Sequence, residues 1–260
     1  MRQYFKELIK RRDLLGYLVI SGLKAQYRNT FLGFFWWLLD PLLSVMVYYF
    51  LVVIVLKRGS QVENYGAFLV VGLIAWRWIR SVVNSSSRSI VLHSGIITRV
   101  YLPKAIFPIS VCFSQLINFS IGLLIAAGVL ACFRIVPGIQ ALWLPVLMLM
   151  QLVFLIALSL VIGYVCVFIR DIDNFIHHLM RFWFYASPVI WAGGRLPKRY
   201  SWIVDINPAS AYLNSYRNIL LYNEGPEFAK LIPIVAVSLV VIGAMLYHYS
   251  RNEHKIIKAL

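Results

Sequence analysis

The sequence contains few charged residues, and acidic residues are especially scarce. Charged side chains make up 13% of the 260 residues and hydrophobic ones 61%, whereas soluble domains average about 25% and roughly 45–50%. This balance excludes an ordinary soluble domain. The apolar residues instead recur in long runs between residues 31 and 249, which is typical of a protein that crosses a membrane several times.

Several features of enzymes and secreted domains are missing from the sequence. Cys112, Cys132 and Cys166 all fall inside apolar runs, so we expect small core residues there and neither a disulfide framework nor a metal site. No Gly-x-x-x-x-Gly-Lys-Ser/Thr loop occurs, so the chain is not expected to bind ATP by that mechanism or to carry a cofactor of its own. The first residues are charged, and no cleavable signal peptide is predicted.

Polar breaks divide the apolar sequence into six segments of the length that a spanning helix needs, about 20 residues. These segments lie at 32–56, 66–92, 106–134, 141–169, 175–193 and 231–249. The sequence therefore predicts an all-α integral membrane protein whose residues 31–260 form one domain of six transmembrane helices. Residues 1–30 would form an amphipathic helix at the membrane interface, either as a topological anchor or as a docking surface for a partner.

The distribution of basic residues predicts the orientation. Thirteen Lys and Arg fall in the N-terminal segment, the 93–105 and 170–174 loops and the tail, against eight in the other connections. This excess favours a cytoplasmic location for both termini. The net charge of +15 is spread along the membrane borders, so we expect anionic lipid headgroups as its counter-charge and no nucleic acid.

The connection at 194–230 is too polar for an ordinary span but contains many apolar residues. We expect a short helix over about 208–222 that re-enters the membrane from the outer face, with a plain extracellular loop helix as the alternative. Asn207 suits the N-cap of this helix and Pro208 its first turn, and Arg217 lies near its end.

Four charged residues fall inside the predicted spans, where an unpaired charge costs about 2.5–3.5 kcal/mol. Asp40 and Arg181 differ in depth by only about 3 Å, so we expect them to form an ion pair, unless Arg181 binds a substrate headgroup. Arg77 and Arg80 lie three residues apart on one helical face. They either snorkel to the interface or line a polar path suited to a polyanion. The following segment, from Ser85 to Arg88, is expected to be a solvated helix end.

Aromatic residues make up 15% of the chain, and most of them are explained by belts at the two membrane interfaces. Rings in the middle of a span need another explanation. Because sugars present apolar C–H faces, aromatic walls can hold a glycan without fixing its register. Trp36, Phe184 and Tyr185 are the candidates for such a wall.

An intramembrane glycosyltransferase is the alternative from a different functional class. Such an enzyme would place acidic residues at a membrane edge, and Asp171 and Asp173 form the one close acidic pair. We expect these two residues to cap a helix instead.

Several motifs together resemble one family. The run YRNTFLGFFW at 27–36 is followed by DPLL at 40–43, LP at 102–103, FIRD at 168–171, SPVIW at 187–191, NP at 207–208 and SYR at 215–217. In this order they resemble the permease subunits of ABC-2 type transporters that export cell-surface polysaccharides. The stretch FYASPVIW at 184–191 is most similar to the branch that exports wall teichoic acid.

This resemblance implies a permease in the bacterial plasma membrane that moves a lipid-linked glycopolymer outward. It implies a homodimer of this chain with two copies of an ABC ATP-binding subunit, which would hold ATP and Mg²⁺. Export of a neutral O-antigen or capsular polysaccharide, or of small drugs, is the alternative within the family. The implied substrate path comprises Trp36, Asp40, Arg77, Arg80, Arg181, Phe184 and Tyr185. The implied contacts with the ATPase comprise Tyr4, Lys6, Arg11, Ile97, Arg99, Tyr101 and Lys104.

Overall fold

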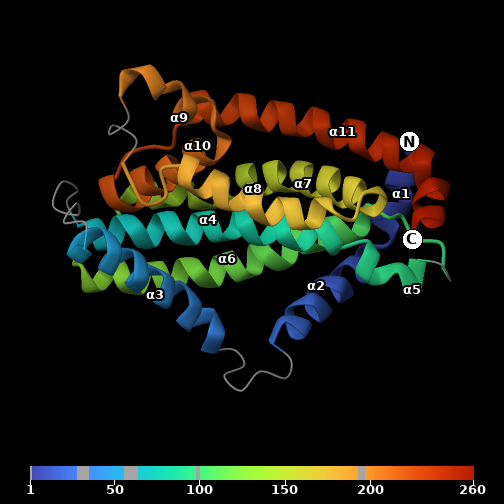
Figure 1. Ribbon diagram of the computed structural model, residues 1–260, viewed down its shortest axis with the longest axis horizontal. Helices are drawn as coiled ribbons and strands as arrows, with labels where there is room; N and C mark the ends of the chain where they lie inside the picture. The colour runs from blue at the N-terminus through green and yellow to red at the C-terminus, as the bar shows by residue number, and fades with distance from the viewer. Residues whose placement is uncertain (1, 28–34, 56–63, 98–99, 193–196) are drawn as a thin grey trace.

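The computed structural model describes residues 2–27, 35–55, 64–97, 100–192 and 197–260, and within these ranges every regular element is helical. The long helices lie side by side along the longest axis of the molecule, as Figure 1 shows. The α-helices are α1 (Arg2–Lys10), α2 (Arg12–Tyr27), α3 (Trp36–Tyr49), α4 (Tyr65–Arg88), α5 (Ser94–Ile97), α6 (Ile106–Cys132), α7 (Leu144–Phe168), α8 (Ile172–Ala186), α9 (Trp202–Ile206), α10 (Pro208–Arg217) and α11 (Phe228–Ala259).

Four helical segments of the described chain are long and apolar enough to cross a membrane. They are Tyr65–Arg88, Ile106–Cys132, Ile139–Phe168 and Phe228–Ala259, which correspond to the second, third, fourth and sixth predicted spans. The all-α fold with several spans is therefore confirmed. The first predicted span contains α3 and a π-helical turn, Phe50–Val55, and its apolar helical part, Leu42–Val55, is shorter than these four segments. A count of six spans stays a prediction.

The helix in the fifth predicted span, 175–193, ends before the predicted limit. Helix α8 stops at Ala186, and Ser187 is extended with φ −101° and ψ 148°. The next residue is Pro188, and a proline pushes the residue before it out of the helical region. Only 15 residues of α8 are helical, about 22 Å at 1.5 Å per residue.

Helix α4 is the central element of the bundle. It packs against α3, α6, α7, α8 and α10, and most of its side chains are buried, including Leu69, Trp78 and Ile79. The Trp78 ring stacks on Phe119 of α6 at 4.4 Å between centroids. Because α4 is surrounded on most sides, its polar side chains have few directions in which to point.

Both termini lie at the same end of the bundle (Figure 1). A second hydrophobic cluster there joins α1, the connection between α4 and α6, and the end of α11, through Tyr4, Ile97, Phe107 and Ile256 among others. The N-terminal segment forms two helices, α1 and α2, and the Ser114 hydroxyl of α6 donates to the Val19 carbonyl oxygen of α2 at 3.3 Å.

The predicted start of the helix after residue 207 is confirmed. The Asn207 side-chain oxygen accepts a hydrogen bond from the Ala209 backbone N–H at 3.0 Å, and Pro208 occupies the first turn of α10. Almost all residues of α10 are buried, so it is no solvent-covered loop helix. Its depth relative to a membrane stays a prediction.

Candidate functional site

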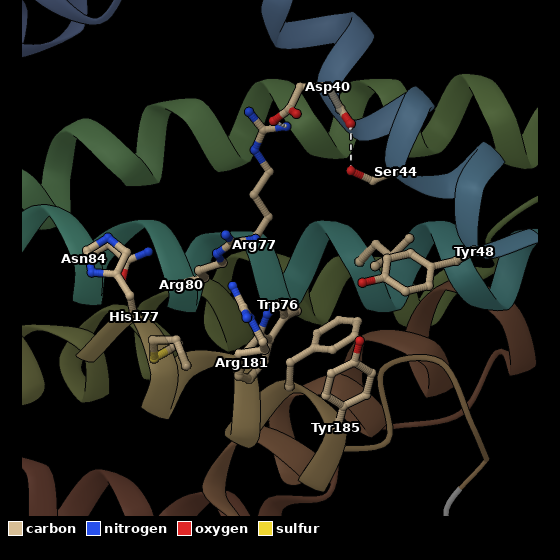
Figure 2. A pocket seen from close by; sticks show the side chains of 13 residues that line it. Asp40, Ser44, Tyr48, Trp76, Arg77, Arg80, Asn84, His177, Arg181 and Tyr185 are labelled. Atoms are coloured by element: carbon tan, nitrogen blue, oxygen red, sulfur yellow. Dashed lines mark hydrogen bonds and ion pairs between the residues drawn. The ribbon is translucent and has the colours of Figure 1, made fainter. Parts of the chain in front are cut away.

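Three helices enclose a pocket of about 300 Å³ near the middle of α4. Helix α3 contributes Asp40, Ser44 and Tyr48, and α4 contributes Leu73, Trp76, Arg77, Arg80 and Asn84; α8 contributes His177, Met180, Arg181, Phe184 and Tyr185. Asn84 and His177 lie at one end, Tyr48 and Tyr185 at the other, and the arginines between them (Figure 2).

The pocket contains most of the side chains that the sequence assigned to a substrate path. Six of those seven residues line it. The seventh, Trp36, lies at the start of α3, is 41% exposed and does not line the pocket. The structure therefore brings together residues from three separate spans, while their role in transport stays a prediction.

The predicted pairing of Asp40 with Arg181 is wrong. Asp40 Oδ2 lies 2.8 Å from Arg77 Nη1, so the ion pair joins α3 to α4 and not α3 to α8. Counting residues favoured Arg181, because Arg77 differs from Asp40 in depth by about 10 Å along its predicted span. In the structure the Arg77 guanidinium points to Asp40 (Figure 2), while its snorkelling to the interface or its place on a polar path stays a prediction.

Arg80 and Arg181 remain without a carboxylate. Within the described ranges, no Asp or Glu lies within ion-pair distance of either guanidinium. Three arginines and one aspartate therefore give the pocket lining a formal charge of +2 with His177 neutral. A cationic pocket of this kind attracts anions.

Aromatic rings form one wall of the pocket. Phe184 contacts Trp76 at 5.7 Å, Tyr48 at 5.4 Å and Tyr185 at 5.1 Å between ring centroids. Because Phe184 is only 7% exposed, it supports this wall from within. Tyr185 is exposed and is the better placed of the two to stack on a ligand.

Four polar lining residues were missed: Ser44, Tyr48, Asn84 and His177. A signal for two of them was present, because Asn84 follows Arg80 by four residues and His177 precedes Arg181 by four. Such spacing places side chains on one face of a helix. Tyr48 and Ser44 follow Asp40 with the same spacing.

A second ion pair, between α4 and α8, lies beyond the Asn84 end of the pocket. Asp173 accepts hydrogen bonds from Arg88 Nε at 2.7 Å and from the Ser87 hydroxyl at 2.5 Å. Burial raises the pKa of Asp173, but the hydrogen bonds from Arg88 and Ser87 outweigh it and hold the pKa below its usual value. Asp173 is thus a structural clamp, and the prediction that it caps a helix is wrong.

Two related predictions are confirmed only in part. Asp171 occupies the N-cap position of α8, but its side chain makes no capping hydrogen bond. At the end of α4, Ser85 and Arg88 are exposed as expected, whereas Ser86 and Ser87 are buried and the Ser86 hydroxyl lies 2.7 Å from that of Ser159.

The residues proposed to contact an ATPase divide into exposed and buried ones. Lys6, Arg11 and Tyr101 are exposed, whereas Ile97 is buried and Tyr4 accepts a hydrogen bond from the Ala105 N–H at 3.3 Å. Lys104 is also buried: its side chain is 1% exposed and its Nζ lies 3.5 Å from Glu253 Oε2 of α11. Arg99 lies outside the described residues.

Arg217, at the end of α10, is fully enclosed and held by backbone oxygens. Its guanidinium donates to the carbonyls of Pro188 at 2.5 Å and Val189 at 2.7 Å, and lies 3.5 Å from the centre of the Phe68 ring. A Cβ on Gly72 of α4 would overlap this guanidinium. Arg217 therefore fastens the chain after α8 to α4 and does not face the pocket.

Comparison with known proteins identifies the family of this chain. Residues 13–221 match the model of a family described as ABC-2 type transporter. The chain is 30% identical over 246 residues to the O-antigen export system permease protein RfbA of Myxococcus xanthus, covering 94% of both chains. It is 26% identical over 238 residues to a protein of the same name from Klebsiella pneumoniae, covering 91% of both. Since the family match extends over most of the sequence and includes α3, α4 and α8, the chain belongs to the ABC-2 type transporter family.

Proposed function

We propose that this chain is the membrane-spanning subunit of an ATP-driven exporter of a lipid-linked cell-surface polysaccharide. Family membership and the similarity to proteins named as O-antigen export permeases support this function. Two copies would associate with two ABC ATP-binding subunits in the bacterial plasma membrane. ATP and Mg²⁺ would be bound by those partners.

The pocket between α3, α4 and α8 is the observation that carries this proposal. It combines guanidinium groups with exposed aromatic and polar side chains near the middle of a buried helix. Aromatic faces suit sugar rings, and arginines suit phosphate because their planar fork donates two parallel hydrogen bonds. In our proposal α3 and α8 part to admit the polymer beside α4.

Two polymer classes are candidates for the exported substrate, and a different observation supports each. The names of the relatives favour an O-antigen type of polysaccharide. The arginine-rich lining favours a polymer that carries phosphate, such as wall teichoic acid. The chemical difference between them is charge, so charge is the property that an experiment has to vary.

Energy coupling is proposed to take place at the end of the bundle that holds both termini. Lys6, Arg11 and Tyr101 are exposed there and available to an ATPase subunit. Tyr4, Ile97 and Lys104 are buried beneath them and would transmit motion to α6 and α11.

The test is export by the reconstituted complex of a lipid-linked anionic polymer and of a matched neutral one. We expect the double change Arg77→Gln with Arg80→Gln to reduce export of the anionic polymer about tenfold or more, because charge-assisted hydrogen bonds contribute about 1.5–3 kcal/mol each. Export of the neutral polymer should change less than about threefold.

Arg251→Gln is the control, since this exposed arginine lies beside Tyr247 at the far end of α11. Equal loss of both polymers, in a complex that still assembles, would show that the arginines do not select for charge. No export of either polymer by the unmodified complex would refute polysaccharide transport itself.

A further inference from the structure

The lining of the pocket contains a cation that is neutralised and two that are not. Arg77 is paired with Asp40, whereas Arg80 and Arg181 have no carboxylate within ion-pair distance in the described ranges. Both residues are exposed, so their charges are open to a ligand. Two unpaired cations that line one pocket point to an anion that comes from outside the chain.

The positions of these two guanidinium groups suit a single ligand. Arg80 comes from α4 and Arg181 from α8, and Figure 2 shows both side chains pointing into the space between the two helices. Asn84 lines the same pocket, and its side-chain amide adds a group able to donate hydrogen bonds. Guanidinium groups bind phosphate oxygens in a bidentate manner, and neutral sugars have no need of them.

Asp40 occupies the position of a competing anion. Its carboxylate contacts Arg77, one helical turn along α4 from Arg80, and its side chain is 60% exposed. An ion pair this accessible contributes only about 0–1 kcal/mol. A phosphate that binds Arg80 and Arg181 therefore needs little free energy to attract Arg77 as well.

We propose that Arg80 and Arg181 bind a phosphate or diphosphate group, and that this group displaces Asp40 from Arg77. Asp40 then acts as an internal counter-ion that keeps α3 against α4 until the ligand arrives. Displacement removes the ion pair between the two helices and frees the first turns of α3. No covalent bond changes, since one anion replaces another on the same guanidinium.

This proposal rests on the proposed export function only for the source of the phosphate. Phosphate binding is therefore measured by itself, in the absence of export. The full chain in lipid nanodiscs is titrated with inorganic pyrophosphate, with a polyprenyl diphosphate and with the corresponding polyprenyl alcohol. We expect Arg80→Gln and Arg181→Gln each to weaken pyrophosphate binding at least about tenfold. The alcohol should not compete with pyrophosphate.

The displacement is tested by the opposite change. Asp40→Asn should tighten pyrophosphate binding about two- to fivefold, because a competitor for Arg77 is removed. This gain should vanish in Asp40→Asn combined with Arg77→Gln. Asp205→Asn is the matched control, since Asp205 is 59% exposed and pairs with Lys230 at the end of the molecule away from the pocket.

The outcomes separate the parts of the proposal. Unchanged or weaker binding in Asp40→Asn would overturn the exchange, and unchanged binding in both Arg80→Gln and Arg181→Gln would overturn the site. Binding of pyrophosphate and of the polyprenyl diphosphate supports a lipid carrier as the source. Binding of pyrophosphate alone supports phosphate of the polymer or the solution. If the unmodified complex binds pyrophosphate but exports no polymer, the export function is contradicted and the binding site stands.

Discussion

Arginines of this bundle are stabilised in two different ways, by backbone carbonyls with an aromatic ring or by an aspartate. Arg217 is surrounded by backbone carbonyls and the Phe68 ring, Arg88 is paired with Asp173, and Arg77 is paired with Asp40. Arg217 is buried and closed to a ligand, whereas Arg88, whose side chain is 63% exposed, has its charge balanced by Asp173. Arg80 and Arg181 have neither kind of compensation, which is why the pocket is the part of the molecule where charge selectivity is expected.

Asp173 is expected to contribute to stability through its hydrogen bonds to α4. Asp173→Asn removes the charge that Arg88 and Ser87 contact, and should lower the free energy of unfolding by about 1–3 kcal/mol at neutral pH. Because the folded-state pKa of Asp173 is lowered, this contribution is present above the ordinary pKa and is lost as pH falls through the lowered value.

Thermal unfolding in detergent measures this contribution. The difference between the wild-type chain and Asp173→Asn should narrow below about pH 4. Asp13→Asn is the control, since Asp13 is 97% exposed and lies 3.9 Å from Arg12. If the wild-type chain and Asp173→Asn unfold at the same temperature at neutral pH, Asp173 does not clamp α8 to α4.

The wrong prediction of the Asp40 partner shows that the position of a residue along a span does not determine which helix it faces. Depth was obtained from the sequence by counting residues, and by that measure Arg181 matches Asp40 to about 3 Å, whereas Arg77 differs from it by about 10 Å. The choice between them depends on how α3 is rotated and on which helix it packs against. Helix α3 contacts α4 and α6, and neither contact is encoded in the number of residues from the membrane edge.

At the scale of elements, the buried pair of Lys104 and Glu253 joins the loop before α6 to the end of α11. Desolvation raises the pKa of the adjacent Tyr101, and the carboxylates of Glu253 and Glu7 raise it further. The Tyr101 hydroxyl therefore stays neutral and able to donate. The whole contact connects α1, the 100–105 loop and α11 into one unit at the end where an ATPase is proposed to bind.

Breaking this unit is expected to impair both stability and coupling. Lys104→Met and Glu253→Gln should each destabilise the chain by about 3–5 kcal/mol, because each leaves a partner that is 10% exposed or less. The double change should destabilise less than the two effects added together. In each single variant, the chain should stimulate the ATPase subunit less than the wild type does, even in complexes that still assemble.

A double-mutant cycle on thermal stability checks this expectation. Lys230→Met and Asp205→Asn, which form an exposed pair at the opposite end, should show an interaction of less than about 1 kcal/mol. Strictly additive effects for Lys104 and Glu253 would mean that the two side chains do not depend on each other.

Helix positions were predictable where apolar runs are long and uninterrupted. Helices α4, α6 and α7 and the start of α11 lie within a few residues of the predicted span limits. Beyond residue 249 the helical path is kinked at Asn252 and goes on to Ala259, with Glu253 and Ile256 buried against the rest of the chain. The early end of α8 at Ser187 was signalled by Pro188, but the long apolar content of 175–193 concealed it.

At the scale of the molecule, the arrangement predicts which native cysteine faces the outside. Cys132 is exposed at the end of α6 that lies away from the termini, whereas Cys112 and Cys166 are buried. With both termini in the cytoplasm, a membrane-impermeant maleimide should label Cys132 in right-side-out vesicles. Cys132→Ser should abolish that labelling.

A cysteine introduced at Leu260 provides the control for the other face. It should be labelled in inside-out vesicles, because the C-terminus lies at the end of the bundle that holds α1 (Figure 1). The reverse pattern for Cys132 and residue 260 would place both termini outside and remove the 100–105 loop from any contact with a cytoplasmic ATPase.

The shared location of the two chain ends has a practical consequence for genetics. Tyr4 and Ile256 belong to one cluster of packed side chains, so the end of one copy and the start of the next emerge on the same side of the membrane. Two copies can then be encoded as a single tandem polypeptide whose linker never crosses the bilayer. Such a fusion would let Asp40 or Arg181 be altered in one half only, and would show whether the two pockets of the proposed two-copy transporter work in turn or together.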